Sequence, residues 1–490
     1  MTTKKKYDAI IVGAGLAGIA CALRLNKKGL RVLVLEKNDK PGGKLSELHS
    51  QGFRWDQGPS LLTEPENINE LFELYGKNPS DYFEFVKHSE SCRYFYNDNS
   101  RITLSSNLQN TKEEIKEAIS ADEAENYESY ISNSKKNYES LGALFLNDSI
   151  PSLLKFLHPK FIKHYPFLLS RTMFRSLNSH NASKFESDKM QLIFNRFGTY
   201  NGSNPYQMSG LYSMIPNLEL NDGTYFPKNG MRSIIDGLYK LALEENIEFS
   251  FEVVVEVEKE RSGYTYRIDD KISGSCKLVI CAIDPISFYD YVLKDLPLSL
   301  KYKKEERSTS GLVFYWGIDT EIPELGLHNI LFSKDYEGEF NTLFKDKKNS
   351  LEPTIYIHIS SLLNQNDAPE NGQNLFVMIN TSSIDTTDDV YIEKIKQYVI
   401  DKIQNQFNVD IGNHIVTENY WDKASIESLT GSYKGALYGA ASNKSDSALK
   451  RHPNTIKKYD NLYFCGGAVH PGGGIPLVLR SAKIVANLIP

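Results

Sequence analysis

The sequence predicts an α/β protein organised around a parallel sheet, and three observations support this fold class. The apolar run Ala9–Val12 leads directly into a glycine-rich turn, Gly13–Gly18. A second apolar run, Leu30–Leu35, follows about one helix later and ends at Glu36. Near the other end of the chain, Leu462–Cys465 again leads into a series of glycines. Short apolar runs of this kind are typical of parallel strands that are buried on both faces.

Length and composition limit the classes of protein that are possible. The chain has 490 residues, enough for several domains, and its 40% hydrophobic and 24% charged residues are typical of a globular protein. Its net charge of −6, from 56 basic and 62 acidic residues, argues against a nucleic-acid partner for the whole surface. The five cysteines form no C-x-x-C pair. We therefore expect neither a disulfide framework nor a metal site, and a cytoplasmic location.

The N-terminus superficially imitates a secretory signal, because Lys4–Lys6 precede the apolar stretch Ala9–Leu23. Asp8 interrupts the entry to this stretch, and its glycines have the spacing of a strand, a turn and a helix. A nucleotide-binding unit is therefore favoured over the signal-peptide alternative. No apolar stretch is long enough to predict a membrane-spanning helix.

The first predicted unit is a β–α–β motif in which each glycine and the following acid have a physical reason. Gly13 permits the tight turn, Gly15 lets a pyrophosphate approach the backbone, and Gly18 lets helix and strand pack closely. Glu36 stands 18 positions after Gly18, where its carboxylate can bind ribose hydroxyls and repel the 2′-phosphate of NADP. The alternative is an ordinary glycine turn, and the motif alone does not choose between NAD and FAD.

Two further glycine turns follow this unit. Pro41–Lys44 places two glycines and a cation just beyond the ribose-binding strand, where backbone N–H groups and the Lys44 charge can reach the same pyrophosphate. A hairpin turn with a solvated lysine is the alternative. A second turn, Gly58–Ser60, lies close behind.

The C-terminal segment contains a second predicted site at which a ligand can approach the backbone closely. Five glycines between Gly466 and Gly474 precede Pro476, a residue suited to the first turn of a helix, and apolar residues continue to Leu488. The positive end of this helix can stabilise the negative charge of a reduced flavin.

At this point the sequence resembles the phytoene-desaturase-like carotenoid desaturases, FAD-dependent oxidoreductases of the amine-oxidase-like superfamily. The resemblance covers most of the chain, and its departures are Lys44, where the family usually has arginine, and Val469, where threonine is common. The second departure puts a hydroxyl contact in doubt. The resemblance to this family rests on the motifs Gly13–Gly18 with Glu36, Gly42–Lys44, Gly58–Ser60, Phe197–Pro205, Tyr225–Met231, Val279–Pro285 and Leu462–Ala486.

The resemblance implies an α/β architecture with a Rossmann-like FAD-binding domain, a mixed β-sheet substrate domain and a helical, membrane-associating insertion. The FAD-binding domain is expected from residues 1–85, 223–295 and 425–490, and the substrate domain from 86–125 and 296–424. The insertion is expected from 126–222. Strands of the substrate domain are expected at Gly311–Trp316, Thr354–Ser361 and Asn374–Asn380.

The resemblance also implies that FAD is bound noncovalently. A backbone contact to adenine is expected from Val254 in a strand Phe251–Val257, and Ile475, Pro476 and Leu477 are expected against the isoalloxazine ring. The cofactor residues carried over from the family are Gly13, Gly15, Leu16, Ala17, Gly18, Glu36, Lys37, Gly43, Lys44, Gly58, Pro59, Ser60, Leu61, Val254, Gly466, Gly467, Ile475, Pro476 and Leu477.

The implied reaction is carotenoid desaturation, in which a hydride leaves an allylic carbon for flavin N5 and the adjacent carbon loses a proton. No general base is identified. His470 and Tyr438 are candidates by their order along the chain, although a histidine beside a glycine turn is more often structural. The electron acceptor is expected to be oxygen or a quinone.

The sequence looks most like the hydroxyneurosporene and 1′-hydroxycarotenoid 3,4-desaturases of this family. Phytoene or diapophytoene desaturation and redox-neutral carotene isomerisation are the alternatives. An amine oxidase would share the nucleotide end but not the C-terminal segment, and a carotenoid carrier would not need the FAD motif.

One stretch of this acidic protein is basic. Ser149–Phe185 contains no Asp or Glu, but six Lys or Arg residues interleaved with apolar ones. It predicts a patch that docks on anionic membranes as a peripheral protein does, with a helix Leu169–Leu177 presenting Leu169, Met173 and Leu177 on one stripe. The alternative is a helix pair packed on the core with a solvated basic face.

Overall fold

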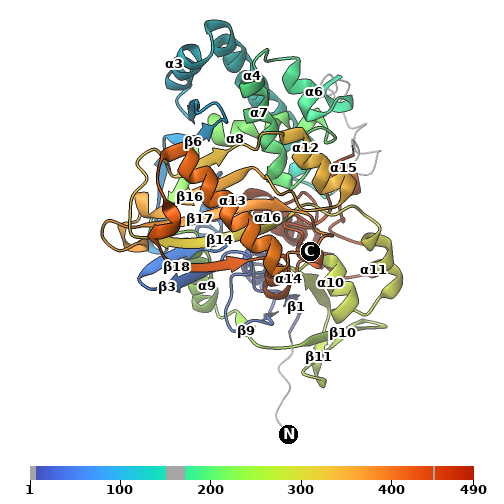
Figure 1. The fold of residues 1–490 in the computed structure, drawn as a ribbon. Coiled ribbons are helices and arrows are strands. Elements are labelled where there is room, and N and C mark those ends of the chain that lie inside the picture. The colour runs from blue at the N-terminus through green and yellow to red at the C-terminus, as the bar shows by residue number, and fades with distance from the viewer. Residues whose placement is uncertain (1–6, 150–170, 445–446) are drawn as a thin grey trace.

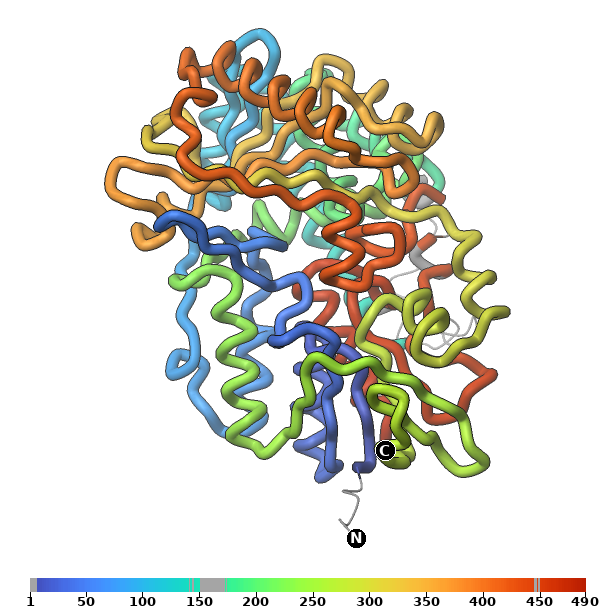
Figure 2. The backbone as a smooth tube through the Cα atoms, turned by 60° about the horizontal axis from the view of Figure 1, so that its bottom comes forward, coloured from blue at the N-terminus to red at the C-terminus, as the bar shows by residue number. Residues whose placement is uncertain are grey.

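The computed structural model describes residues 7–149, 171–444 and 447–490. Its central feature is a five-stranded parallel sheet that gathers strands from both ends and the middle of the chain. The strands lie in the order β19 (Leu462–Phe464), β13 (Leu278–Cys281), β1 (Ala9–Val12), β2 (Val32–Leu35) and β9 (Glu248–Ser250). Figure 2 shows these N-terminal (blue), middle (yellow-green) and C-terminal (red) segments side by side at one end of the molecule.

Apolar cores cover both faces of this sheet. On one face, α1 (Leu16–Lys27) packs with α2 (Glu66–Glu73), α9 (Arg232–Glu244) and α16 (Ile475–Leu488). On the other face lie the antiparallel strands β10 (Val255–Glu260), β11 (Gly263–Ile268) and β12 (Lys271–Cys276), followed along the chain by α10 (Pro285–Ser287) and α11 (Leu296–Lys303). Burial on both faces explains why β1 and β2 consist wholly of apolar residues.

A seven-stranded mixed sheet forms the second layer. It runs in the order β18 (Ile415–Trp421), β14 (Ser310–Ile318), β17 (Gln373–Thr381), β16 (Ile355–Ile359), β15 (His328–Leu331), β6 (Glu90–Phe95) and β7 (Arg101–Ser105). The pair β15 and β6 is parallel and the other pairs are antiparallel. The predicted strands at 311–316, 354–361 and 374–380 correspond to β14, β16 and β17. Helix α13 (Asp389–Phe407) packs against this sheet in its own apolar core.

A helical layer lies at the end of the molecule opposite β10 and β11 (Figure 1). Most of its helices share one apolar core with β6, β7 and β15. They are α3 (Leu108–Ala118), α4 (Ala121–Leu141), α7 (Asp188–Arg196), α8 (Pro216–Leu220) and α12 (Tyr336–Asn341). Another helix of this layer, α6 (Leu177–Ala182), packs against α7.

Two small antiparallel sheets of two strands each connect these layers. In one, β3 (Glu47–Ser50) pairs with β4 (Phe53–Asp56), and in the other β5 (Phe85–His88) pairs with β8 (Thr224–Pro227). Arg54 on β4 donates to the buried carboxylate of Asp56, and the same carboxylate accepts from the N–H groups of Met231 and Arg232. Arg54 also reaches Asp367 beside the seven-stranded sheet. This buried network ties the start of α9 to the second layer.

The structure bears on three details of the sequence-based prediction. The expected domain boundaries at 85/86, 125/126 and 424/425 fall inside β5, α4 and α14 (Lys423–Thr430), and the division of the chain into domains stays a prediction. Of the expected strand Phe251–Val257, only Val255–Val257 form a strand, the start of β10, because β9 already ends at Ser250.

The third detail concerns the helix expected over Leu169–Leu177. A short 3-10 helix spans Arg171–Phe174, and Ser176 is extended before it caps α6, so one continuous stripe through Leu177 is wrong. Leu177 is buried, whereas Phe174 is 77% exposed. Most of the basic stretch lies outside the described residues.

No helix within the described ranges is long and apolar enough to cross a membrane. All five cysteines are buried free thiols. In the part of the chain that the structure describes, no group of three or more His, Cys, Asp or Glu side chains is arranged to hold a metal ion.

Candidate functional site

A cavity of about 920 Å³ runs from the carboxyl edge of the parallel sheet to the inner face of the mixed sheet. The segments after β1, β2, β13 and β19 all open into it, because parallel strands present their carboxyl ends at the same edge. Its nucleotide-binding part is lined by glycines and Glu36, and its deeper part mainly by apolar side chains. A volume of this size fits a cofactor site.

The turn after β1 is held tightly against its own helix. Gly13 has a φ of +107°, a conformation that favours glycine, and its N–H donates to the Leu35 carbonyl. A Cβ added at Gly18 would lie 1.9 Å from the Gly13 carbonyl oxygen, so only glycine allows α1 to start here. At Gly15, by contrast, an added Cβ would meet nothing closer than 4.0 Å. Gly15 therefore leaves its backbone bare beside the cavity, as the approach of a phosphate requires.

Glu36 is buried at the end of β2, where its carboxylate bridges two turns. One oxygen accepts the Ala14 N–H at 2.7 Å and the other accepts the Asn38 N–H at 3.0 Å. The carboxylate thus fixes the glycine turn, and it lines the cavity where ribose hydroxyls are expected.

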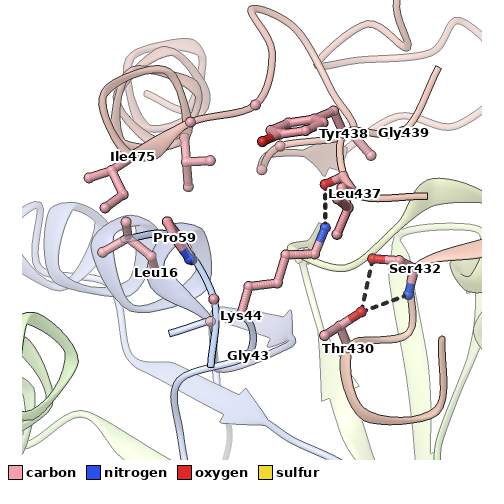
Figure 3. Close-up of a pocket in the computed structure, with 18 of the residues that line it drawn as sticks. Leu16, Gly43, Lys44, Pro59, Thr430, Ser432, Leu437, Tyr438, Gly439 and Ile475 are labelled. Atoms are coloured by element: carbon pink, nitrogen blue, oxygen red, sulfur yellow. Dashed lines mark hydrogen bonds between the residues drawn. The ribbon is translucent and has the colours of Figure 1, made fainter. Parts of the chain in front are cut away.

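Lys44 extends from the second glycine turn across the cavity wall toward the C-terminal part of the chain (Figure 3). Its ammonium group donates to the Leu437 carbonyl at 2.6 Å. Burial lowers the pKa of Lys44 to about 8, an effect that Asp284 opposes and Arg307 reinforces. Gly42 meets the first turn directly, since its N–H donates to the Ala14 carbonyl.

The C-terminal glycine turn forms the opposite wall. An added Cβ would find open space at Gly474 and nothing within 3.5 Å at Gly466. The Gly466 N–H donates to the Ser481 hydroxyl of α16 at 3.2 Å. The buried Arg451 side chain donates to the carbonyls of Tyr438 and Gly467 and so joins two segments of this wall. Because these glycines carry no side chains, a flat ring system can pack directly against their backbone.

The two candidate catalytic residues have different environments. Tyr438 lines the cavity with its ring packed against Gly202 and Gly473, and burial raises its pKa to about 12. His470 also borders the cavity, and its Nε2 donates to the Asp148 carbonyl at 2.9 Å. Burial lowers the pKa of His470. This geometry indicates that His470 anchors the end of the helical layer to the glycine turn.

The cavity brings together nearly all of the cofactor residues expected from the sequence. Gly18 is the exception, since it acts inside the helix–strand contact. Val254 lines the cavity, yet its N–H donates to the Asp269 carboxylate and its carbonyl accepts the Asp269 N–H. Asp269 would therefore compete with adenine for the backbone groups of Val254. The backbone contact from Val254 to adenine stays a prediction.

Sequence reasoning missed the deeper part of the cavity. A row of polar side chains lies there, in which Arg196, Tyr200, Glu219, His328 and Tyr356 come from four separate segments. Arg196 pairs with Glu219 at 3.0 Å although both side chains are buried. The available signals were Tyr200, which lies inside the Phe197–Pro205 motif, and Arg196, which directly precedes it.

The fold and the glycine-lined cavity define a dinucleotide-binding protein, and comparison with known proteins identifies it as a flavoprotein. A family model described as flavin containing amine oxidoreductase matches residues 16–490. The chain belongs to this family and is an oxidoreductase that uses FAD.

Relatives of known activity place the chain more closely, in the carotenoid desaturase group. It is 42% identical to a 1-hydroxycarotenoid 3,4-desaturase from Flavobacterium sp. (strain P99-3), covering 98% of this chain and 99% of that one. It is 30% identical to a 4,4′-diapolycopene oxygenase from Methylomonas sp., covering 100% and 99%. A 4,4′-diapophytoene desaturase from Staphylococcus aureus (strain Newman) is 27% identical, with 97% of each chain covered.

Solved structures confirm the fold. A wild-type putrescine oxidase bound to putrescine superposes with a TM-score of 0.64 at 13% identity, covering 99% of both chains. Cyclohexylamine oxidase from Brevibacterium oxydans gives a TM-score of 0.61 at 15% identity, covering 99% and 100%.

We predict that Glu36→Arg weakens FAD retention by about tenfold or more, because it removes two charge-assisted hydrogen bonds to the turns and the acceptors for ribose. The FAD content after gel filtration measures this effect. Glu73→Arg, a charge reversal at an exposed position of α2, is the matched control and should retain FAD. Equal FAD content in both variants would contradict the assigned role of Glu36.

We also predict that FAD affinity falls as the pH rises through about 8. Lys44 is charged below its pKa and attracts the pyrophosphate, whereas above it the attraction is lost, with at most a tenfold loss in affinity per pH unit. Lys44→Arg should flatten this pH dependence because arginine stays protonated. Fluorescence titration of the apoprotein with FAD at several pH values tests this, and the same pH dependence in parent and Lys44→Arg would rule it out.

Proposed function

We propose that this protein is an FAD-dependent carotenoid desaturase that forms the 3,4 double bond of a 1′-hydroxycarotenoid. The single observation that supports this substrate best is the 42% identity, over nearly the full length of both chains, to a 1-hydroxycarotenoid 3,4-desaturase. The cavity agrees with a polyene substrate, since its deeper part is lined by side chains such as Ile215, Leu218, Ile330 and Met378.

The chain's own residues would bind and orient FAD. Gly13, Gly15 and Gly43 leave room for the pyrophosphate, Glu36 accepts from ribose, and Lys44 supplies a positive charge. Gly466, Gly467 and the start of α16 at Ile475–Leu477 support the ring. When bound, FAD supplies the hydride acceptor for an allylic carbon of the substrate.

The remaining chemistry needs little from the protein. The extended polyene stabilises the positive charge that develops after hydride loss, so a weak base suffices for the proton on the adjacent carbon. The apolar walls exclude water, which would otherwise add to the cation. Oxygen or a quinone would then take the two electrons and complete the cycle.

We predict that the purified FAD-loaded protein converts a 1′-hydroxylated acyclic or monocyclic carotenoid into a product two hydrogens lighter with a red-shifted absorption spectrum. Mass spectrometry and absorbance after chromatography measure both changes. A product of unchanged mass with altered cis–trans geometry would instead identify an isomerase, and removal of FAD should abolish either activity.

We further propose that the substrate is loaded from a membrane surface, on which Ser149–Phe185 docks the protein. A C40 polyene is almost insoluble in water, so it must come from a bilayer. At the described end of this stretch, Phe174 is 77% exposed beside the exposed Arg175. An apolar side chain next to a basic one suits the interface of an anionic membrane.

We expect a variant with five of these basic residues changed to Gln to lose most co-sedimentation with anionic liposomes at low salt, with FAD content unchanged. Each basic residue near an anionic surface contributes about 1 kcal/mol. The five are Lys155, Lys160, Lys163, Arg171 and Arg175. A control variant with the exposed Lys345, Lys347 and Lys348 changed to Gln should sediment like the parent. Equal sedimentation of the five-residue variant would leave the stretch as an ordinary packed layer.

A further inference from the structure

The polar row in the deeper part of the cavity is unusual because its surroundings are apolar. In the mixed sheet, Tyr356 lies opposite Met378 on one side and Ile330 on the other, and Met378 lies opposite Val313. All four side chains line the cavity. A tyrosine hydroxyl thus interrupts a cross-strand row that otherwise suits a hydrocarbon.

Tyr356 is held in place by two hydrogen bonds. Its hydroxyl lies 2.6 Å from the Ser60 hydroxyl and 2.7 Å from Nδ1 of His328. Ser60 belongs to the Gly58–Ser60 turn that is expected to contact the cofactor, so Tyr356 and His328 stand within two hydrogen bonds of that turn. The polar pair therefore borders a turn that is expected to contact the cofactor.

His328 can bind a further polar atom. The structure shows no partner for its Nε2 within the described residues, although the residue lines the cavity and is only 5% exposed. Burial, together with His358, His88 and the Arg196 guanidinium, holds the pKa of His328 well below its usual range. A neutral imidazole offers one donor and one acceptor, and a hydroxyl group can pair with either tautomer.

An ion pair between Arg196 and Glu219 also lines this part of the cavity and adds to its polar character. Arg196 donates to Tyr94 at 2.6 Å and to Glu219, and Tyr200 donates to the same carboxylate. Tyr94 lies opposite Ile330 in the sheet, so the ion pair borders the same row. A pure hydrocarbon placed against His328 would leave the Nε2 of this buried residue without a partner, which is costly.

We propose that Tyr356 and His328 form the subsite for the hydroxyl group on carbon 1 of the carotenoid substrate. This inference rests on the proposed function. In a 1-hydroxylated chain, carbon 1 is two carbons away from carbon 3, so the hydroxyl group must lie close to the bond that is oxidised in a 3,4-desaturation. A polar subsite next to the cofactor turn meets this requirement, whereas one at the far end of a long tunnel would not.

The test compares 1-hydroxylycopene with lycopene, each in liposomes, on the FAD-loaded enzyme. The parent should favour the hydroxylated substrate in kcat/KM by about tenfold or more, the effect expected for a buried hydrogen bond. Tyr356→Phe should remove most of this preference, because it should lower kcat/KM for 1-hydroxylycopene by about tenfold more than for lycopene. Tyr398→Phe, which also removes a tyrosine hydroxyl but lies outside the cavity lining, should keep the parent's preference.

A binding measurement separates this inference from the proposed function. Each carotenoid is titrated while the flavin fluorescence is followed, which gives a Kd even if no turnover occurs. Tighter binding of 1-hydroxylycopene that disappears in Tyr356→Phe would support the subsite even if the enzyme proved not to be a desaturase. If Tyr356→Phe folds poorly, as judged by FAD content, His328→Leu tests the same loss.

Two results would overturn the inference. The first is an equal loss for both substrates in Tyr356→Phe and His328→Leu, which would show a general role in packing or chemistry. The second is an unchanged preference in both variants, or a parent enzyme that binds the two carotenoids equally well.

Discussion

The site depends on one constraint, the parallel pairing of β1 with β13 and of β13 with β19. Parallel strands end at the same edge of a sheet, so the turn at Gly13, the segment after Cys281 and the turn at Gly466 must meet there. Backbone bonds from Ala282 to Val12 and from Cys465 to Cys281 continue the pairing beyond the strands. Residues more than 450 positions apart thereby form one cofactor cavity.

Buried charges then join the sheet to the rest of the molecule. Glu36 fixes the glycine turn to β2, and Arg54 joins β4, the start of α9 and the mixed sheet through Asp56 and Asp367. Arg451 links the segment at Tyr438 to the C-terminal turn. A buried charge is tolerated only where its partners are well placed, so each of these groups specifies one arrangement of the elements around it.

The cavity also changes character along its length, and this change corresponds to two kinds of ligand. Near the parallel sheet its walls are bare backbone, which can approach phosphates and a flat ring. Near the mixed sheet its walls are apolar side chains with one polar row, which suits a long hydrocarbon bearing one polar group. The mixed sheet supplies most of this second part because alternate residues of β14, β15, β16 and β17 face inward.

The sequence by itself determined the elements whose signals are local. Glycine spacing, buried apolar strands and a following acid identified β1, α1, β2 and Glu36, and the glycines before Pro476 identified the start of α16 to within one residue. The expected domain boundary at 125/126 lies within α4, whose helical pattern continues through it, and the division into domains stays a prediction. The expected strand Phe251–Val257 began four residues before β10, because the apolar residues that precede Val255 give no sign of a break.

Only the tertiary structure decided which distant side chains meet in the cavity. His328, Tyr356, Arg196 and Glu219 have no shared motif, and their proximity follows from strand order and from the packing of α7 and α8 against the mixed sheet. The same holds for His470, whose hydrogen bond to the Asp148 carbonyl no sequence pattern predicts. Local patterns carry backbone requirements, whereas a side-chain constellation depends on contacts between segments that the chain brings together only when it folds.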